Sequence, residues 1–164
     1  DNAVITYAKP VYYVKGKPIE TLRVKQAFTL VIGDTGIKSP TSAAVGAVRQ
    51  AWEGDPQHFD RLFDEAGAIA ASGRKAIETG QVDALGRLMN ENQALLQQMT
   101  VSSAELEVLV EAARSAGALG AKLSGAGRGG SMIAIVSSDA SEGVARALEA
   151  AGAVHTIVTE IPET

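Results

Sequence analysis

Residues 125–130 constrain the fold most, because four glycines fall there within six positions, between two runs of mainly apolar residues. A tight turn between strands needs only one or two glycines, since two residues with positive φ reverse the chain. Neighbouring glycines also let several backbone N–H groups converge on one anion, as in phosphate-binding nests. No Gly-Lys-Ser/Thr sequence ends the segment, so it is not a P-loop. Two interpretations remain, a glycine-rich hairpin and an anion-binding loop.

The pattern of apolar residues predicts one α+β domain over residues 1–164. Residues 3–24 alternate β-branched or aromatic residues with polar ones, which is typical of short antiparallel strands joined by a turn. Helical spacing of apolar residues follows, in several runs between residues 41 and 113. We expect a mainly antiparallel sheet that helices cover, on one face. Further elements are predicted as strands at 27–33, 118–125, 131–136 and 153–161 and a helix at 139–151.

Two local signals predict where helices begin. Asp55 followed by Pro56 is typical of an N-cap and the first helical turn. Ser102 with Glu105 three residues later forms a capping-box signature. The helix after this second signal is expected to bury Leu106, Leu109, Val110 and Ala113.

Residues 35–41 are a second candidate for anion binding, because they follow a predicted buried strand and open a predicted helix. The unpaired N–H groups and the dipole at such a helix start favour an anion. Ser39 and Thr41 supply hydroxyl groups. Thr41 is also the expected N-cap of this helix, which is expected to bury Val45 and Val48.

Charge and composition narrow the classes of partner. With 15 Lys and Arg against 19 Asp and Glu, the net charge of −4 lacks the basic excess that nucleic-acid binding requires. The absence of cysteine excludes disulfides and thiolate metal sites, and the two histidines are far apart in the sequence. No apolar run approaches the roughly 20 residues of a membrane span, and residues 1–20 lack a signal-peptide pattern. We expect a cytoplasmic protein with no nucleic-acid partner, no membrane partner and no metal-ligating residues in this chain.

Three segments of the sequence resemble motifs of one enzyme family. The segment "GAKLSGAGRGGSMIAIV" is similar to the third motif of the GHMP small-molecule kinases. The segments "GDTGIKSPTSAAVGAVR" and "LMNENQALLQQMTVSSAELEVLVEAARSAGALGAKLSGAG" resemble the mevalonate kinases within that family. The resemblance covers nearly the whole chain but only the C-terminal half of the usual family polypeptide. Residues 1–164 are therefore expected to form a GHMP kinase C-terminal domain, with the N-terminal half absent from this chain.

The resemblance implies a reaction and the residues that serve it. Family members transfer a phosphoryl group from ATP to an alcohol, here mevalonate or a similar small alcohol of isoprenoid biosynthesis. Asp1 and Asn2 resemble the context of the catalytic aspartate, which accepts the hydroxyl proton, and Thr41 is expected to lie near it with a catalytic role. Arg128 either reaches a phosphate or substrate carboxylate or points to solvent. The residues expected beside the nucleotide phosphates are Gly125, Ala126, Gly127, Arg128, Gly129 and Gly130.

The resemblance also implies what this chain lacks. The first and second family motifs, and the residues that hold magnesium, have no match in the sequence, so ATP and Mg²⁺ are expected to be bound mainly by the missing N-terminal half. Phosphoryl transfer depends on those parts, so the chain alone is expected to be inactive. Because the surface that meets the missing half is expected to be apolar, we expect the chain to need that partner or to self-associate, for instance as a homodimer.

Two other interpretations remain open. The chain can be the C-terminal half of another GHMP enzyme, namely a phosphomevalonate kinase, galactokinase or homoserine kinase. It can also be a binding or assembly module without catalysis, because α+β domains bind effectors or dimerise without chemistry.

Overall fold

The computed structural model describes residues 10–164, and its centre is a four-stranded antiparallel sheet in the order β4-β5-β3-β6. The strands are β3 (Phe28–Asp34), β4 (Gly120–Ser124), β5 (Ser131–Val136) and β6 (His155–Ile161). All four predicted strands are confirmed. The ends of β5 agree with the prediction, and those of the other three strands differ from it by up to two residues. The antiparallel α+β class is confirmed as well.

Burial alternates along the central strand β3, because successive side chains of a strand point to opposite faces of the sheet and one face packs against helices. Thr29, Val31 and Gly33 are buried, whereas Leu30 and Ile32 between them are only partly buried. Val31 belongs to the main hydrophobic core, together with residues of the neighbouring strands and of the helices. One face of the sheet is therefore covered more completely than the other.

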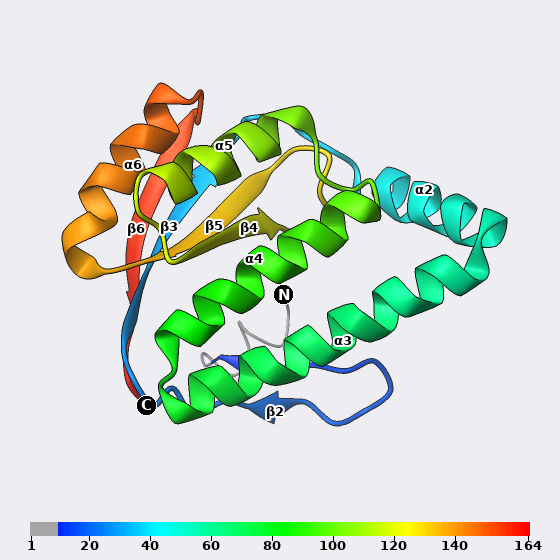
Figure 1. The fold of residues 1–164 in the computed structure, drawn as a ribbon, viewed down its shortest axis with the longest axis horizontal. Coiled ribbons are helices and arrows are strands. Elements are labelled where there is room, and N and C mark those ends of the chain that lie inside the picture. The colour runs from blue at the N-terminus through cyan, green and yellow to red at the C-terminus, as the bar shows by residue number, and fades with distance from the viewer. Residues whose placement is uncertain (1–9) are drawn as a thin grey trace.

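The helices are arranged around this sheet in two groups (Figure 1). Helices α5 (Ala104–Ser115) and α6 (Ser141–Ala150) lie over one face of the sheet, and α6 follows a short 3₁₀ turn, η1 (Ser138–Ala140). Helix α4 (Val82–Gln98) runs beside the edge strand β4, with α3 (Pro56–Thr79) next to it. Helix α2 (Thr41–Gly54) lies at the end of the molecule beside α3. The prediction that helices cover one face of the sheet therefore holds for α5 and α6, but not for α2, α3 and α4.

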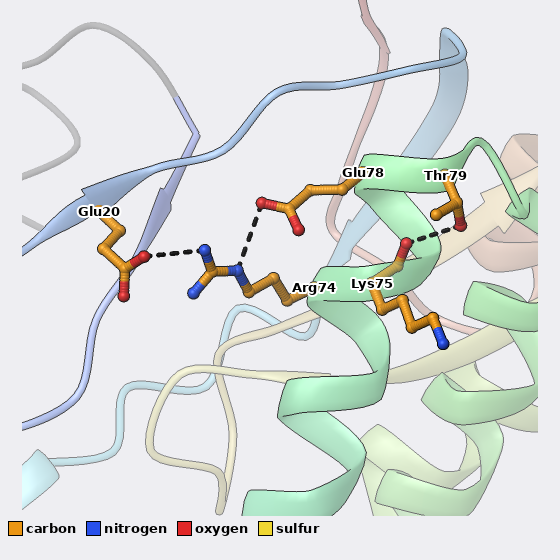
Figure 2. A network of polar contacts seen from close by, with 5 residues as sticks. All are labelled: Glu20, Arg74, Lys75, Glu78 and Thr79. Carbon is orange, nitrogen blue, oxygen red and sulfur yellow. Dashed lines mark hydrogen bonds and ion pairs between the residues drawn. The ribbon is translucent and has the colours of Figure 1, made fainter.

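An antiparallel hairpin of β1 (Val11–Tyr12) and β2 (Glu20–Thr21) precedes the sheet, as predicted. Arg74 of α3 holds this hairpin (Figure 2), with Nη2 donating to Glu20 at 2.8 Å and Nε to Glu78 at 3.3 Å. The guanidinium also lies 5.0 Å from the centre of the Tyr12 ring, which permits a cation–π contact. Figure 2 also shows the Thr79 hydroxyl, which donates to the backbone carbonyl of Lys75 near the end of α3.

The predicted helix starts are partly right. Asp55 caps α3, because its side chain accepts from the His58 N–H at 3.1 Å. Helix α5 is capped by Ser103, so the prediction of Ser102 is wrong by one residue. Thr41 is the first residue of α2 and not its N-cap, which is Pro40.

The predicted burial is also partly right. All four apolar residues expected in the core from α5 are buried. Val48 of α2 packs against the core, but Val45 is 60% exposed, because α2 contacts α3 instead of lying on the sheet.

Candidate functional site

The glycine segment forms the connection between the antiparallel strands β4 and β5. Its four glycines and Arg128, with φ 60°, adopt the left-handed region of backbone conformation. Residues 125–130 also satisfy the spacing G-x-G-x-x-G, but the dinucleotide motif requires a strand before it and a helix after it. Here a strand follows, so that interpretation does not apply.

Two other segments hold this loop in place. On one side, the Thr35 N–H and hydroxyl both donate to the Gly130 carbonyl at 2.9 Å, and the Gly130 N–H donates to the Ile37 carbonyl at 2.8 Å. On the other side, the Arg128 N–H donates to the Val101 carbonyl at 2.7 Å. The loop is therefore a supported structure with a defined backbone path.

Two of the loop glycines are required because the backbone of another segment approaches them closely, in addition to their positive φ. A Cβ atom on Gly127 would lie 2.1 Å from the Val101 carbonyl oxygen, and one on Gly129 would lie 2.7 Å from that of Ile37. The N–H groups of Gly125 and Ala126 donate to no residue within 10–164. Because no acceptor within this range occupies them, these two amides can bind an anion. Gly125 is exposed and Ala126 is partly buried, so both are accessible.

Thr41 and the glycine loop share one pocket of about 510 Å³. Helix α2 forms one wall with Thr41 and apolar side chains, while Gly125 and Ala126 form another. The site therefore combines amide donors and one hydroxyl with a mainly apolar wall, made by Ala44, Val45, Val48 and Val101.

The other predicted site residues lie as follows. Arg128 has an exposed side chain, and Gly129 and Gly130 lie where the loop meets residues 35–37. Asp1 lies outside the residues that the structure describes. Lys122, just before the loop, donates to the Leu123 carbonyl, and burial lowers the pKa of its amine.

Sequence reasoning missed the supports of this site. Gln93 is fully buried in α4, and its side-chain amide bonds to the strand that enters the loop. The family resemblance draws attention to Gln93 only as a possible ligand contact, because relatives often carry a histidine at this position, and not as a support of the loop.

Neither a metal cluster nor a membrane helix occurs within the described range. Residues 10–164 contain no group of three or more His, Cys, Asp or Glu side chains placed to hold a metal ion. The donors around the glycine loop are amides and a hydroxyl, so they do not fit Mg²⁺, which prefers carboxylate oxygens. No helix in the same range is long and apolar enough to cross a bilayer.

Comparisons with known sequences point to one family. Residues 74–154 match the family model described as GHMP kinases C terminal. Mevalonate kinase of Thermococcus sibiricus is 39% identical, over 92% of this chain and 46% of that protein. Mevalonate kinase of Pyrococcus furiosus is 37% identical, with the same coverage of 92% and 46%. The chain thus spans about half the length of the curated relatives it matches.

Solved structures show the same relationship. Mevalonate kinase from L. major, in complex with R-mevalonate, has a TM-score of 0.87 and 35% identity, over 94% of this chain and 48% of that one. Mevalonate kinase from methicillin-resistant Staphylococcus aureus has a TM-score of 0.69 and 29% identity, over 93% of this chain and 48% of that one. Phosphomevalonate kinase from Streptococcus pneumoniae, at 18% identity and a TM-score of 0.74, covers 87% of this chain and 43% of that one and shares the fold.

Proposed function

The chain belongs to the GHMP kinases and carries their C-terminal domain, and from this premise we propose that it is the C-terminal half of a mevalonate kinase. The whole enzyme transfers the γ-phosphoryl group of ATP to the hydroxyl group of mevalonate, in isoprenoid biosynthesis in the cytoplasm. The observation that carries the proposal is the pocket that joins Thr41 to the glycine loop. The similarity to mevalonate kinase from L. major, whose structure is a complex with R-mevalonate, supports mevalonate as the alcohol.

The glycine loop is proposed to bind the phosphates of ATP. Gly125 and Ala126 present N–H groups that donate to no acceptor within residues 10–164, and the bonds of Arg128 and Gly130 hold the loop so that these donors are preorganised. Preorganised donors stabilise charge that develops in phosphoryl transfer without a cost of reorganisation. Arg128, with its exposed side chain, adds a positive charge at the rim of the loop.

Asp1 and Thr41 are proposed to act on the alcohol. Asp1 accepts the proton of the attacking hydroxyl group, and the Thr41 hydroxyl hydrogen-bonds to the substrate beside it. Mg²⁺, which neutralises phosphate charge in such reactions, is assigned to residues of an N-terminal half, because residues 10–164 offer no ligand set for it. The same half supplies most contacts to ATP, and it is the main partner of this chain.

A steady-state assay tests this function in a protein that joins this chain to such an N-terminal half. With ATP and mevalonate, Asp1→Asn is expected to lower kcat far more than it weakens nucleotide binding, because it removes the proton acceptor only. Thr41→Val is expected to lower kcat/KM for mevalonate. Ser115→Ala, on the exposed end of α5, serves as the control.

Other outcomes would replace the proposal. Turnover with phosphomevalonate, galactose or homoserine, and none with mevalonate, would assign the chain to another GHMP kinase. Absence of turnover with every alcohol, in protein that folds and binds ATP, would favour a module that binds without catalysis.

A further inference from the structure

Gln93 is a fully buried polar residue whose side chain makes three hydrogen bonds. Its Oε1 accepts from the Leu123 N–H at 2.8 Å, and its Nε2 donates to the Ser102 hydroxyl at 2.9 Å and to Glu107 Oε1 at 2.8 Å. The donors and acceptors of one amide are thus used on three different parts of the chain. A buried amide is costly unless its hydrogen bonds are made, so this position requires its partners.

Two of these partners, Leu123 and Ser102, lead to the glycine loop. Leu123 lies in β4, two residues before the loop begins at Gly125. Ser102 follows Val101, whose carbonyl accepts the Arg128 N–H at 2.7 Å and would meet a Cβ on Gly127 at 2.1 Å. Glu107 belongs to α5, so its bond ties the same group to the helix that covers the sheet.

A second side chain of α4 extends this arrangement along the edge of β4. Asn90 Oδ1 accepts from the Ala121 N–H at 3.0 Å, and its Nδ2 lies 3.4 Å from the Leu119 carbonyl as a donor. Asn90 and Gln93 thus pair with the outer edge of β4 where another strand would otherwise bind. The edge strand that leads into the loop is fixed by side chains of α4.

We propose that Gln93 is a positioning residue for the glycine loop, because it fixes the end of β4 and the Val101 support at the same time. Gln93 does not touch substrate, and it acts by holding Leu123 and the Val101–Ser102 segment at a set separation. That the loop binds phosphate rests on the proposed function. The positioning itself is a property of this chain and can be measured without any ligand.

Gln93→Glu tests the proposal with almost no change of volume. A carboxylate cannot donate to Glu107, and it places a second negative charge beside that residue. Hydrogen exchange in the isolated chain then reports on the Arg128 N–H, compared with the amides that pair β3 with β6. We expect the protection of the Arg128 N–H to fall by about tenfold relative to those reference amides. A general loss of stability would lower both sets equally.

Two further variants separate positioning from mere destabilisation. Gln97→Glu alters a neighbour that also donates to Glu107 but is exposed and does not reach β4, so the Arg128 N–H should keep its protection. Glu107→Gln, added to Gln93→Glu, exchanges donor and acceptor, because the new amide at position 107 can donate to the new carboxylate at position 93 and accept from Gln97. The double variant should recover most of the lost protection, and it replaces the single variant if that one does not fold.

The outcomes that would overturn the proposal are distinct from failure of the proposed function. Protection of the Arg128 N–H within twofold of the wild type in Gln93→Glu, an equal loss in Gln97→Glu, or no recovery in the double variant would each reject the positioning role. Titration with inorganic tripolyphosphate, followed by the amide shifts of Gly125 and Ala126, tests phosphate binding separately. If the wild type shows no binding, the proposed function loses its support while the exchange result still decides the role of Gln93.

Discussion

Gly86 of α4 and Gly120 of β4 pack backbone against backbone, so that a Cβ atom on Gly120 would lie 1.9 Å from the Gly86 carbonyl oxygen. The reverse contact is also closed, because a Cβ on Gly86 would lie 2.7 Å from the Leu119 carbonyl oxygen. This approach brings α4 close enough for the amides of Asn90 and Gln93 to reach β4. Two glycines that do not line the pocket therefore determine how β4, the strand that enters the loop, is held.

Gly120→Ala is expected to destabilise the domain by about 3 kcal/mol, because neither backbone can move without loss of the α4–β4 contacts. Urea unfolding followed by circular dichroism measures this change. Gly67→Ala, at an exposed position of α3 with nothing within 4 Å, is the matched control and is expected to stabilise by about 0.5 to 1 kcal/mol. Equal stability of the two variants would contradict the close packing.

Gly127→Ala is expected to move the loop as well as destabilise it, because the methyl group meets the Val101 carbonyl and φ is 80°. Gly125→Ala has a similar φ of 89° but no atom within 4 Å, so it measures the backbone strain alone, about 1 to 2 kcal/mol. Nucleotide affinity in the two-domain protein should fall more for Gly127→Ala than for Gly125→Ala. The opposite order would show that support by Val101 is unimportant for binding.

The ion pair between Glu20 and Arg74 predicts a pH-dependent stability of the hairpin. The hydrogen bond and charge of Arg74 hold the pKa of Glu20 below its usual value. The stabilisation is therefore present above the unfolded pKa of about 4.3 and is lost as the pH falls through the lowered folded pKa. Glu20→Gln should lower stability at pH 7 and have less effect at pH 3, as measured by urea unfolding. Glu53→Gln, in an exposed pair with Arg49, should have little effect at either pH.

The isolated chain is expected to show no ATP-dependent phosphorylation of mevalonate, because the first and second family motifs have no match in its sequence. A coupled assay at millimolar ATP and mevalonate, on material free of full-length enzyme, measures this. Turnover that rises in proportion to the concentration of this chain would contradict the prediction.

Self-association is expected from the large apolar side chains that remain exposed on two sides of the molecule. Trp52 and Phe63 are exposed on α2 and α3, and Ile157 and Val158 on β6. Light scattering at increasing concentration should therefore show a rise in mass, and addition of an N-terminal half should reverse it if α2 and α3 face that partner. A constant monomer mass up to high concentration would contradict this expectation.

Local periodicity was sufficient to predict most elements. The strand 131–136 and the four buried residues of α5 were predicted correctly, because alternation and helical spacing depend only on neighbours along the chain. The start of α6 was less accurate, since a 3₁₀ turn over Ser138–Ala140 precedes it. Propensities do not distinguish a 3₁₀ turn from the first turn of an α-helix.

The cap of α5 shows where local reasoning fails. The capping-box spacing to Glu105 favours Ser102 over Ser103 in the sequence. In the structure, however, the Ser102 hydroxyl accepts from Gln93, and Ser103 accepts from the Leu106 N–H. Gln93 comes from another helix, so no spacing along the chain contains this information.

The sequence by itself determined the α+β class, the glycine loop between two strands and the family to which the chain belongs, because these follow from local pattern and motif. Only the tertiary structure placed Val101 beside Gly127 and buried Gln93 against β4. Those contacts join residues far apart in sequence, and their geometry depends on how α4 and β4 approach at Gly86 and Gly120. Close packing and buried hydrogen bonds arise between elements, whereas periodicity describes each element alone.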